Sequence, residues 1–187
     1  MGIHDREYYR DETPRGVNLG GDWSIVTKLI VINVLVYVAD IFAGGDHWLM
    51  SSLAASPESI TQPWLCWQLL TYAFAHDTHG FNHIFWNMFG LWIFGPLVER
   101  HLGRKRFLAF YLLCGIFGAL LYLLLNFTGS RLAGVGMDSI PFLLPNDTHL
   151  PLIGASAGVF GVLFAGAFLA PNMTVLLFFV IPIRLVT

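Results

Sequence analysis

The arrangement in this chain with the clearest chemical potential is a serine set among small residues. Residues 154–158 read Gly-Ala-Ser-Ala-Gly and match the G-x-S-x-G pattern that surrounds the nucleophilic serine of many hydrolases. In soluble hydrolases that pattern joins a strand to a helix, whereas here it opens a long apolar stretch without repeated strand–helix units. The four-residue spacing of Gly154 and Gly158 also suits close packing between membrane helices. The motif alone therefore leaves packing and catalysis open.

The position of Ser156 favours a chemical role. We expect it in the first turn of a membrane helix at about 152–169, near the outer end. There the unpaired backbone N–H groups and the positive end of the helix favour developing negative charge. The small residues around the serine would let another helix bring a base within about 3 Å of its hydroxyl. Packing and catalysis thus require the same glycines.

A second polar cluster is expected at the same depth. His83 and Asn87 are four residues apart, so they share one face at the outer end of a helix predicted at 81–99. Polar side chains at such a position more often point inward than toward lipid. As hydrogen-bond donors, both suit an oxyanion hole opposite Ser156.

The histidines of this segment have a rival interpretation as metal ligands. His76, His79 and His83 lie close together in the sequence, but there is no H-E-x-x-H motif, and His101 and His149 are far away. We therefore expect no metal and no cofactor. We interpret His79 as a solvated loop residue. We expect His76 to lie with it further from the membrane than His83, where water competes for its hydrogen bonds.

Glu99 is the one acidic residue near the inner end of the 81–99 helix. Gly95, Glu99 and Gly103 repeat by four and share a face. We predict that the carboxylate is a structural hydrogen-bonding anchor rather than a catalytic acid.

The elements that must position these residues are membrane helices. Hydrophobic residues make up 56% of the chain and charged residues only 12%, about half the share in soluble domains. Apolar stretches long enough for membrane helices predict an all-α, polytopic helix bundle. Its expected parts are a tail at 1–23, spans at 24–44, 81–99, 107–127 and 152–169, a first loop at 45–80, a basic turn at 100–106 and a second loop at 128–151.

The distribution of basic residues predicts the orientation. Lys and Arg gather in the N-terminal tail and in the 100–106 turn, whereas the first loop has none. The N-terminus is therefore expected in the cytoplasm, with the plasma membrane as the host membrane. The tryptophans of the first loop favour the membrane interface or the outer leaflet. A net charge of −2 gives no sign of nucleic-acid binding.

The apolar segment 172–183 has two interpretations. It is short, and Pro182 would disturb a helix, so we favour a segment lying at the inner interface. The alternative is a fifth span that begins at Pro171.

Taken together, these motifs resemble the rhomboid family. The stretch WQLLTYAFAH at 67–76, the H-x-x-x-N of His83 and Asn87, the G-x-x-x-E-x-x-x-G of 95–103 and GASAGVFG at 154–161 occur in the family's order and spacing. The resemblance covers residues 24–187, read as a rhomboid-like membrane domain. It implies a six-helix core, of which the chain would supply about four spans and lack the fifth and sixth helices.

The resemblance also implies a function. Rhomboid proteases cleave transmembrane proteins with a Ser–His dyad, so Ser156 would be the nucleophile, with His83 and Asn87 holding the oxyanion. The family's catalytic histidine lies on the sixth helix, and no histidine follows Ser156 here. We therefore expect an intramembrane serine endopeptidase whose base lies beyond this chain, so that residues 1–187 alone are inactive. The alternative is a non-catalytic rhomboid-like protein that binds transmembrane clients.

Overall fold

The structure, a computed structural model, describes residues 23–43, 48–56, 59, 62–133, 151–171, 174–177 and 181–184. The expected tail before Trp23 and the greater part of the second loop, 134–150, lie outside the described residues. The described elements are α1 (Ile25–Phe42), α2 (Trp48–Leu53), η3 (Pro63–Leu65), α4 (Gln68–Thr71), η4 (Tyr72–Phe74), α5 (Phe81–Leu102), α6 (Arg104–Ala133), α7 (Ser156–Leu169), β1 (Thr174–Leu177) and β2 (Ile181–Arg184).

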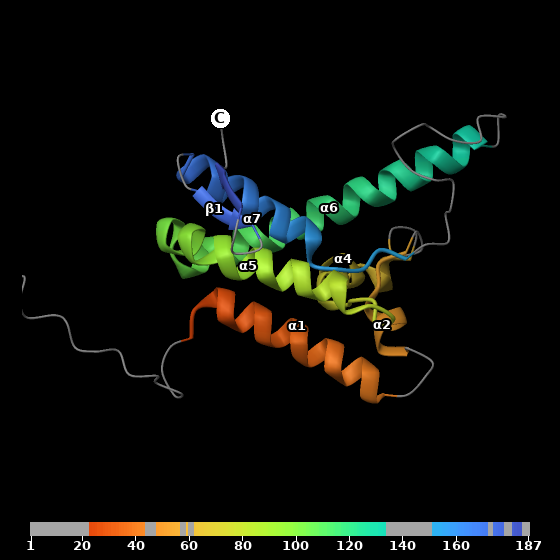
Figure 1. The fold of residues 1–187 in the computed structure, drawn as a ribbon. Helices are drawn as coiled ribbons and strands as arrows, with labels where there is room; N and C mark the ends of the chain where they lie inside the picture. Colours follow the sequence, from red (N-terminus) through yellow and green to blue (C-terminus); the bar gives the residue numbers. More distant parts are fainter. Residues whose placement is uncertain are drawn as a thin grey trace, which may run out of the picture.

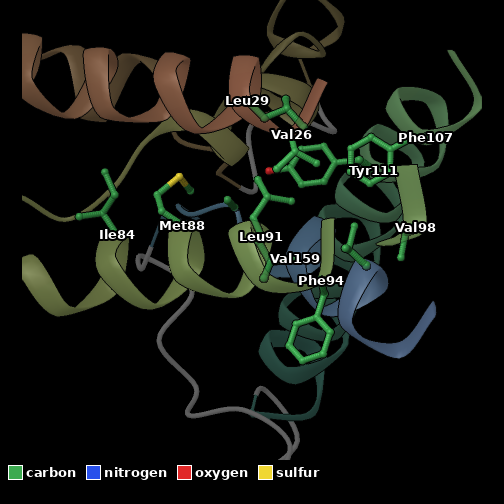
Figure 2. Packing of buried hydrophobic residues seen from close by; sticks show 12 residues of the cluster. Val26, Leu29, Ile84, Met88, Leu91, Phe94, Val98, Phe107, Tyr111 and Val159 are labelled. Atoms are coloured by element: carbon green, nitrogen blue, oxygen red, sulfur yellow. The ribbon is translucent and has the colours of Figure 1, made fainter. Parts of the chain in front are cut away.

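Four long helices form the bundle, and α7 packs against both α5 and α6 (Figure 1). Helix α1 packs along α5, and the short helices of the first loop gather near the end of α1 and the start of α5. Figure 2 shows the apolar side chains that join the helices. This cluster contains Val26, Leu29, Ile84, Met88, Leu91, Phe94, Val98, Phe107, Tyr111, Ala155, Val159 and Val162.

Small residues let α7 approach its neighbours closely. A Cβ atom on Gly158 would lie 2.7 Å from Cε2 of Tyr111 on α6, and one on Gly161 would lie 2.5 Å from Sγ of Cys114. On the other side, a Cβ on Gly90 of α5 would lie 3.1 Å from Val159. The glycines therefore occupy positions where the neighbouring helix leaves no room for a side chain.

The bundle exposes large apolar side chains on its outer faces and buries several polar residues within its otherwise apolar interior, which is unusual for a soluble protein. Large apolar side chains on the outer faces of α1, α6 and α7 are exposed, for example Leu35, Phe117 and Phe168. Buried polar residues include Asn33, Asp40, Gln68, His76, Asn87, Glu99 and Asn126. Two described helices, α1 and Arg104–Gly129 of α6, are long and apolar enough to cross a membrane, and the 14-residue α7 is also apolar. The expected membrane helix bundle is confirmed.

The boundary between the second and third helices differs from the prediction. The basic residues at 100–106 were expected to form a turn, but α5 continues to Leu102 and α6 begins at Arg104. Gly103 alone separates them, with φ of +77°. With ψ of 157°, Gly103 adopts a positive-φ extended conformation that glycine tolerates far better than other residues, so one residue is enough to separate the two helices.

The described residues of the segment after α7 form a two-stranded sheet rather than a helix. Strands β1 and β2 pair antiparallel, with Thr174 opposite Arg184 and Leu177 opposite Ile181. The alternative of a helical fifth span beginning at Pro171 is therefore wrong for these residues. Neither interpretation of the sequence predicted strands here.

Candidate functional site

Ser156 is the first residue of α7, and its side chain is partly exposed. The first backbone hydrogen bond of α7 runs from Val159 to the carbonyl of Ala155, at 3.0 Å. The N–H groups of residues 156–158 therefore have no partner within the helix, as at any helix N-terminus. The serine hydroxyl and these N–H groups lie together at the positive end of α7.

The turn before Ser156 is tied to the first loop by backbone hydrogen bonds. Leu152 and Ala55 form an isolated antiparallel bridge, with N···O distances of 2.8 and 3.0 Å. The Gly154 N–H donates to the carbonyl of Tyr72 at 3.0 Å, and the Tyr72 hydroxyl donates to the Gly115 carbonyl of α6 at 2.6 Å. The first loop thus holds the turn that carries Ser156.

His83 lies directly against this turn. Gly154 has φ of +109°, and a Cβ atom there would lie 2.6 Å from Nε2 of His83. Only glycine fits both the backbone conformation and the space. Asn87, one turn further along α5, is buried and donates through Nδ2 to the carbonyl of His83 at 2.9 Å.

Ser156, His83 and Asn87 line one open groove of about 370 Å³ between α5 and α7. The remaining lining residues are mostly apolar: Asn82, Trp86, Gly90, Val159, Phe160 and Leu163. The sequence predicted that these three polar residues lie at one depth in the membrane. In the structure, all three line the same groove. A groove with mostly apolar walls can bind an apolar segment beside the serine.

The placement of His76 differs from the prediction, which put it in water. Its side chain is 2% exposed, and its ring packs edge-on against His83 with 5.1 Å between ring centroids. Its Nε2 accepts a long hydrogen bond, 3.4 Å, from the N–H of Ala155. No local sequence pattern predicts this contact, because His76 and Ala155 are 79 positions apart.

His79, in contrast, is a solvated loop residue, as expected. Its ring is exposed and lies 3.0 Å from the Asp77 carboxylate. Hydrogen bonds from the backbone and ring of His79 hold the pKa of the Asp77 carboxyl below its usual range. His79 therefore does not converge with His76 and His83, and no group of three possible metal ligands occurs among the described residues.

Glu99 contacts the start of α1. Its carboxylate accepts the N–H groups of Ile25 at 2.9 Å and Val26 at 3.1 Å. Gly95, on the same face, leaves room for Val26, whose Cγ2 would lie 2.6 Å from a Cβ atom there. Glu99 thus satisfies unpaired N–H groups of the first turn of α1 and joins α1 to α5.

Comparison with known proteins identifies the family. The family model of the Rhomboid domain matches residues 63–187. RHOMBOID-like protein 12, mitochondrial, of Arabidopsis thaliana is 28% identical over 163 residues, which cover 87% of this chain and 46% of that protein. Rhomboid protein 1, mitochondrial, of Saccharomyces cerevisiae is 35% identical over 106 residues, 57% of this chain and 26% of that protein.

A third relative, from Bacillus subtilis and named "Putative rhomboid protease YdcA", is 40% identical over 52 residues, 28% of this chain and 25% of that protein. The chain spans less than half the length of these curated relatives. No solved structure gave a significant match. The family match covers more than half of the chain and agrees with the membrane helix bundle, so this chain belongs to the rhomboid family.

Proposed function

We propose that this chain carries the nucleophile and the oxyanion hole of an intramembrane serine endopeptidase. The observation that supports this most is the groove lined by Ser156, His83 and Asn87. In the proposed reaction, the Ser156 hydroxyl attacks a peptide carbonyl of a transmembrane substrate. His83, Asn87 and the Ser156 N–H donate hydrogen bonds to the oxyanion that forms.

Each donor is in a suitable state for this role. The Ser156 N–H belongs to the unpaired first turn of α7. Asn87 has two amide N–H bonds and uses one for the His83 carbonyl, which leaves the second for a ligand. His83 is held between Gly154 and His76, so its ring would need little rearrangement when charge develops.

The base is proposed to come from a segment that follows residue 187, as the rhomboid pattern implies. His83 is an unsuitable base in this scheme, because an oxyanion donor needs an N–H where a base needs a free lone pair. No metal or cofactor takes part. The apolar groove walls Trp86 and Phe160 suit a transmembrane substrate that is unwound near the groove.

For the topology, we propose that residues 24–187 form the membrane domain and that the preceding tail is cytoplasmic. The basic ends of α5 and α6 would then face the cytoplasm, in accord with the positive-inside rule. The plasma membrane remains our proposed location, although two of the relatives are named mitochondrial.

The test uses the protein encoded by the complete gene, purified in detergent. It should be labelled by a serine-directed fluorophosphonate and should cleave a transmembrane reporter, and Ser156→Ala should abolish both. Ser51→Ala is the matched control, because Ser51 lies on an exposed face of α2 and bonds only locally to Trp48. Cleavage that persists in folded Ser156→Ala would refute the proposal. A folded wild-type protein that binds but never cleaves the reporter would favour the client-binding alternative.

A further inference from the structure

His76 stands out as a buried imidazole that the proposed reaction does not use. It lies between η4 and α5 in the chain, and its side chain is 2% exposed. It contacts both halves of the site: its Nε2 accepts the Ala155 N–H, and its ring supports that of His83.

We propose that His76 is a positioning residue for Ser156, whose neutral imidazole fixes the Ala155–Ser156 turn by accepting the Ala155 N–H and supports the His83 ring. This inference rests on the proposed roles of Ser156 and His83. The Ala155 N–H belongs to the peptide just before the one that carries the Ser156 N–H, so loss of this bond would loosen the backbone that leads into Ser156. Both the nucleophile and one oxyanion donor would move together.

The role requires a specific protonation state. Nε2 can accept a hydrogen bond only when it has a free lone pair, so the proton must be on Nδ1. Burial lowers the pKa of His76 to about 4, aided by the neighbouring His83, and the Phe74 backbone offsets only part of this effect. The ring is therefore neutral at neutral pH, as the contact with Ala155 demands.

The other groups around His76 do not oppose this state. On α5, the neighbouring titratable group is His83. On η4, burial raises the pKa of Tyr72 to about 12, so its hydroxyl stays neutral. Asp77 follows directly, but its carboxylate is engaged with the backbone and ring of His79, at 2.9 and 3.0 Å. The turn before α7 offers Ala155 and Ser156, neither of which is charged.

The serine turn has supports that do not involve His76. The Leu152–Ala55 bridge and the Gly154–Tyr72 bond hold its backbone to the first loop. Removal of the imidazole acceptor should therefore leave the turn attached but less precisely oriented. We therefore expect removal of the acceptor to lower kcat strongly while the unfolding midpoint changes little.

The experiment compares three variants of the complete protein. His76→Phe keeps a ring against His83 but removes the acceptor, His76→Gln restores an acceptor near the position of Nε2, and His79→Gln is the exposed control. We expect His76→Phe to lower kcat for a transmembrane reporter about 10- to 100-fold, with KM and the unfolding midpoint little changed. His76→Gln should recover most of this loss, and His79→Gln should match the wild type.

Two results would overturn the inference: wild-type kcat in His76→Phe, or equal losses in His76→Phe and His76→Gln. If His76→Phe fails to fold, ¹⁵N NMR of histidine-labelled wild-type protein tests the inference by measuring the tautomer of His76. The Nδ1–H tautomer of His76 at neutral pH supports the role, and an Nε2–H tautomer or an imidazolium refutes it. Unchanged cleavage by Ser156→Ala would instead refute the proposed function, so the two failures are distinguishable.

Discussion

Substitution of Gly154 by alanine tests the geometry of the site most directly. Two independent effects should destabilise this variant. The φ of +109° is unfavourable for any residue with a side chain, at about 1–2 kcal/mol. The new methyl group would also lie 2.6 and 2.7 Å from Nε2 and Cε1 of His83, and that ring cannot retreat freely because His76 packs against it. Overpacking of this kind costs about 1–3 kcal/mol, so the expected total is about 2–5 kcal/mol.

Two other glycines separate these effects. Gly103 also has a positive φ, +77°, but a Cβ atom there would meet nothing within 4 Å. Gly103→Ala should therefore lower the free energy of unfolding through backbone strain alone, by about 1–2 kcal/mol. Gly80 has an extended φ of −146° and open space around it, so Gly80→Ala should be nearly neutral. The difference between Gly154→Ala and Gly103→Ala measures the contact with His83.

The assay is unfolding of the complete protein in detergent micelles, followed by tryptophan fluorescence, together with fluorophosphonate labelling of Ser156. Gly154→Ala should lose labelling by displacing His83 or the serine turn, whereas Gly103→Ala and Gly80→Ala should keep it. Equal destabilisation in Gly154→Ala and Gly103→Ala, with labelling intact in both, would show that His83 does not lie against the serine turn. The arrangement of the oxyanion donors described here would then be wrong.

Three further predictions use the same unfolding assay. Gly158→Ala should destabilise the protein by about 1–3 kcal/mol, because the methyl group would lie 2.7 Å from the ring of Tyr111. Glu99→Gln should cost about 1–3 kcal/mol, because a single amide oxygen cannot replace two carboxylate oxygens at the first turn of α1. Acid should destabilise the protein through His76: with a folded pKa of about 4, below the usual 6.5, the unfolded state binds the proton first, so stability falls by up to about 3 kcal/mol from pH 6.5 to 4.

Each of these predictions has a control in the same structure. Gly115→Ala places its methyl group 3.9 Å from the Tyr72 hydroxyl, so it should be neutral or slightly stabilising. Arg104→Gln removes an exposed group 3.9 Å from Glu99 and should cost less than about 1 kcal/mol. His76→Gln should reduce the acid dependence, since glutamine does not titrate. A Gly115→Ala loss as large as that of Gly158→Ala, an Arg104→Gln loss as large as that of Glu99→Gln, or an acid dependence unchanged in His76→Gln would contradict the corresponding reasoning.

The sequence was sufficient to predict which helices meet at the groove. Polar residues in an apolar helix must face inward, and this condition alone placed His83 and Asn87 on the inner side of the second long helix. Small residues at spacings of four marked the face of α7 that packs closely, and Gly158 and Gly161 do lie against α6. Both signals are local, because each depends only on the period of one helix.

Other features depended on contacts that no local pattern reveals. His76 is buried against a peptide group 79 residues away, a contact that its own segment does not reveal, so its polar character alone suggested solvent. The basic residues at 100–106 predict which side of the membrane they face, but charge does not end a helix, and α5 ends at the positive φ of Gly103. Pro182 indicated correctly that its segment is not helical. The pairing of β1 with β2 could not be predicted in the same way, because it depends on two segments together.

The length of α7 bears on the depth of Ser156 in the membrane. With 14 residues, the helix is about 21 Å long, whereas the hydrocarbon core of a bilayer is about 30 Å thick. The two ends of α7 therefore cannot both reach the membrane surfaces, and if its last turn lies at one surface, Ser156 lies about 9 Å inside the other. In the proposed reaction, hydrolysis at that depth would need a route for water from outside. The His83, Asn82 and Asn87 side chains line the groove at the N-terminal end of α7, on the side where the first loop meets the serine turn. The first loop thus holds the serine turn at the end of α7 that borders this groove.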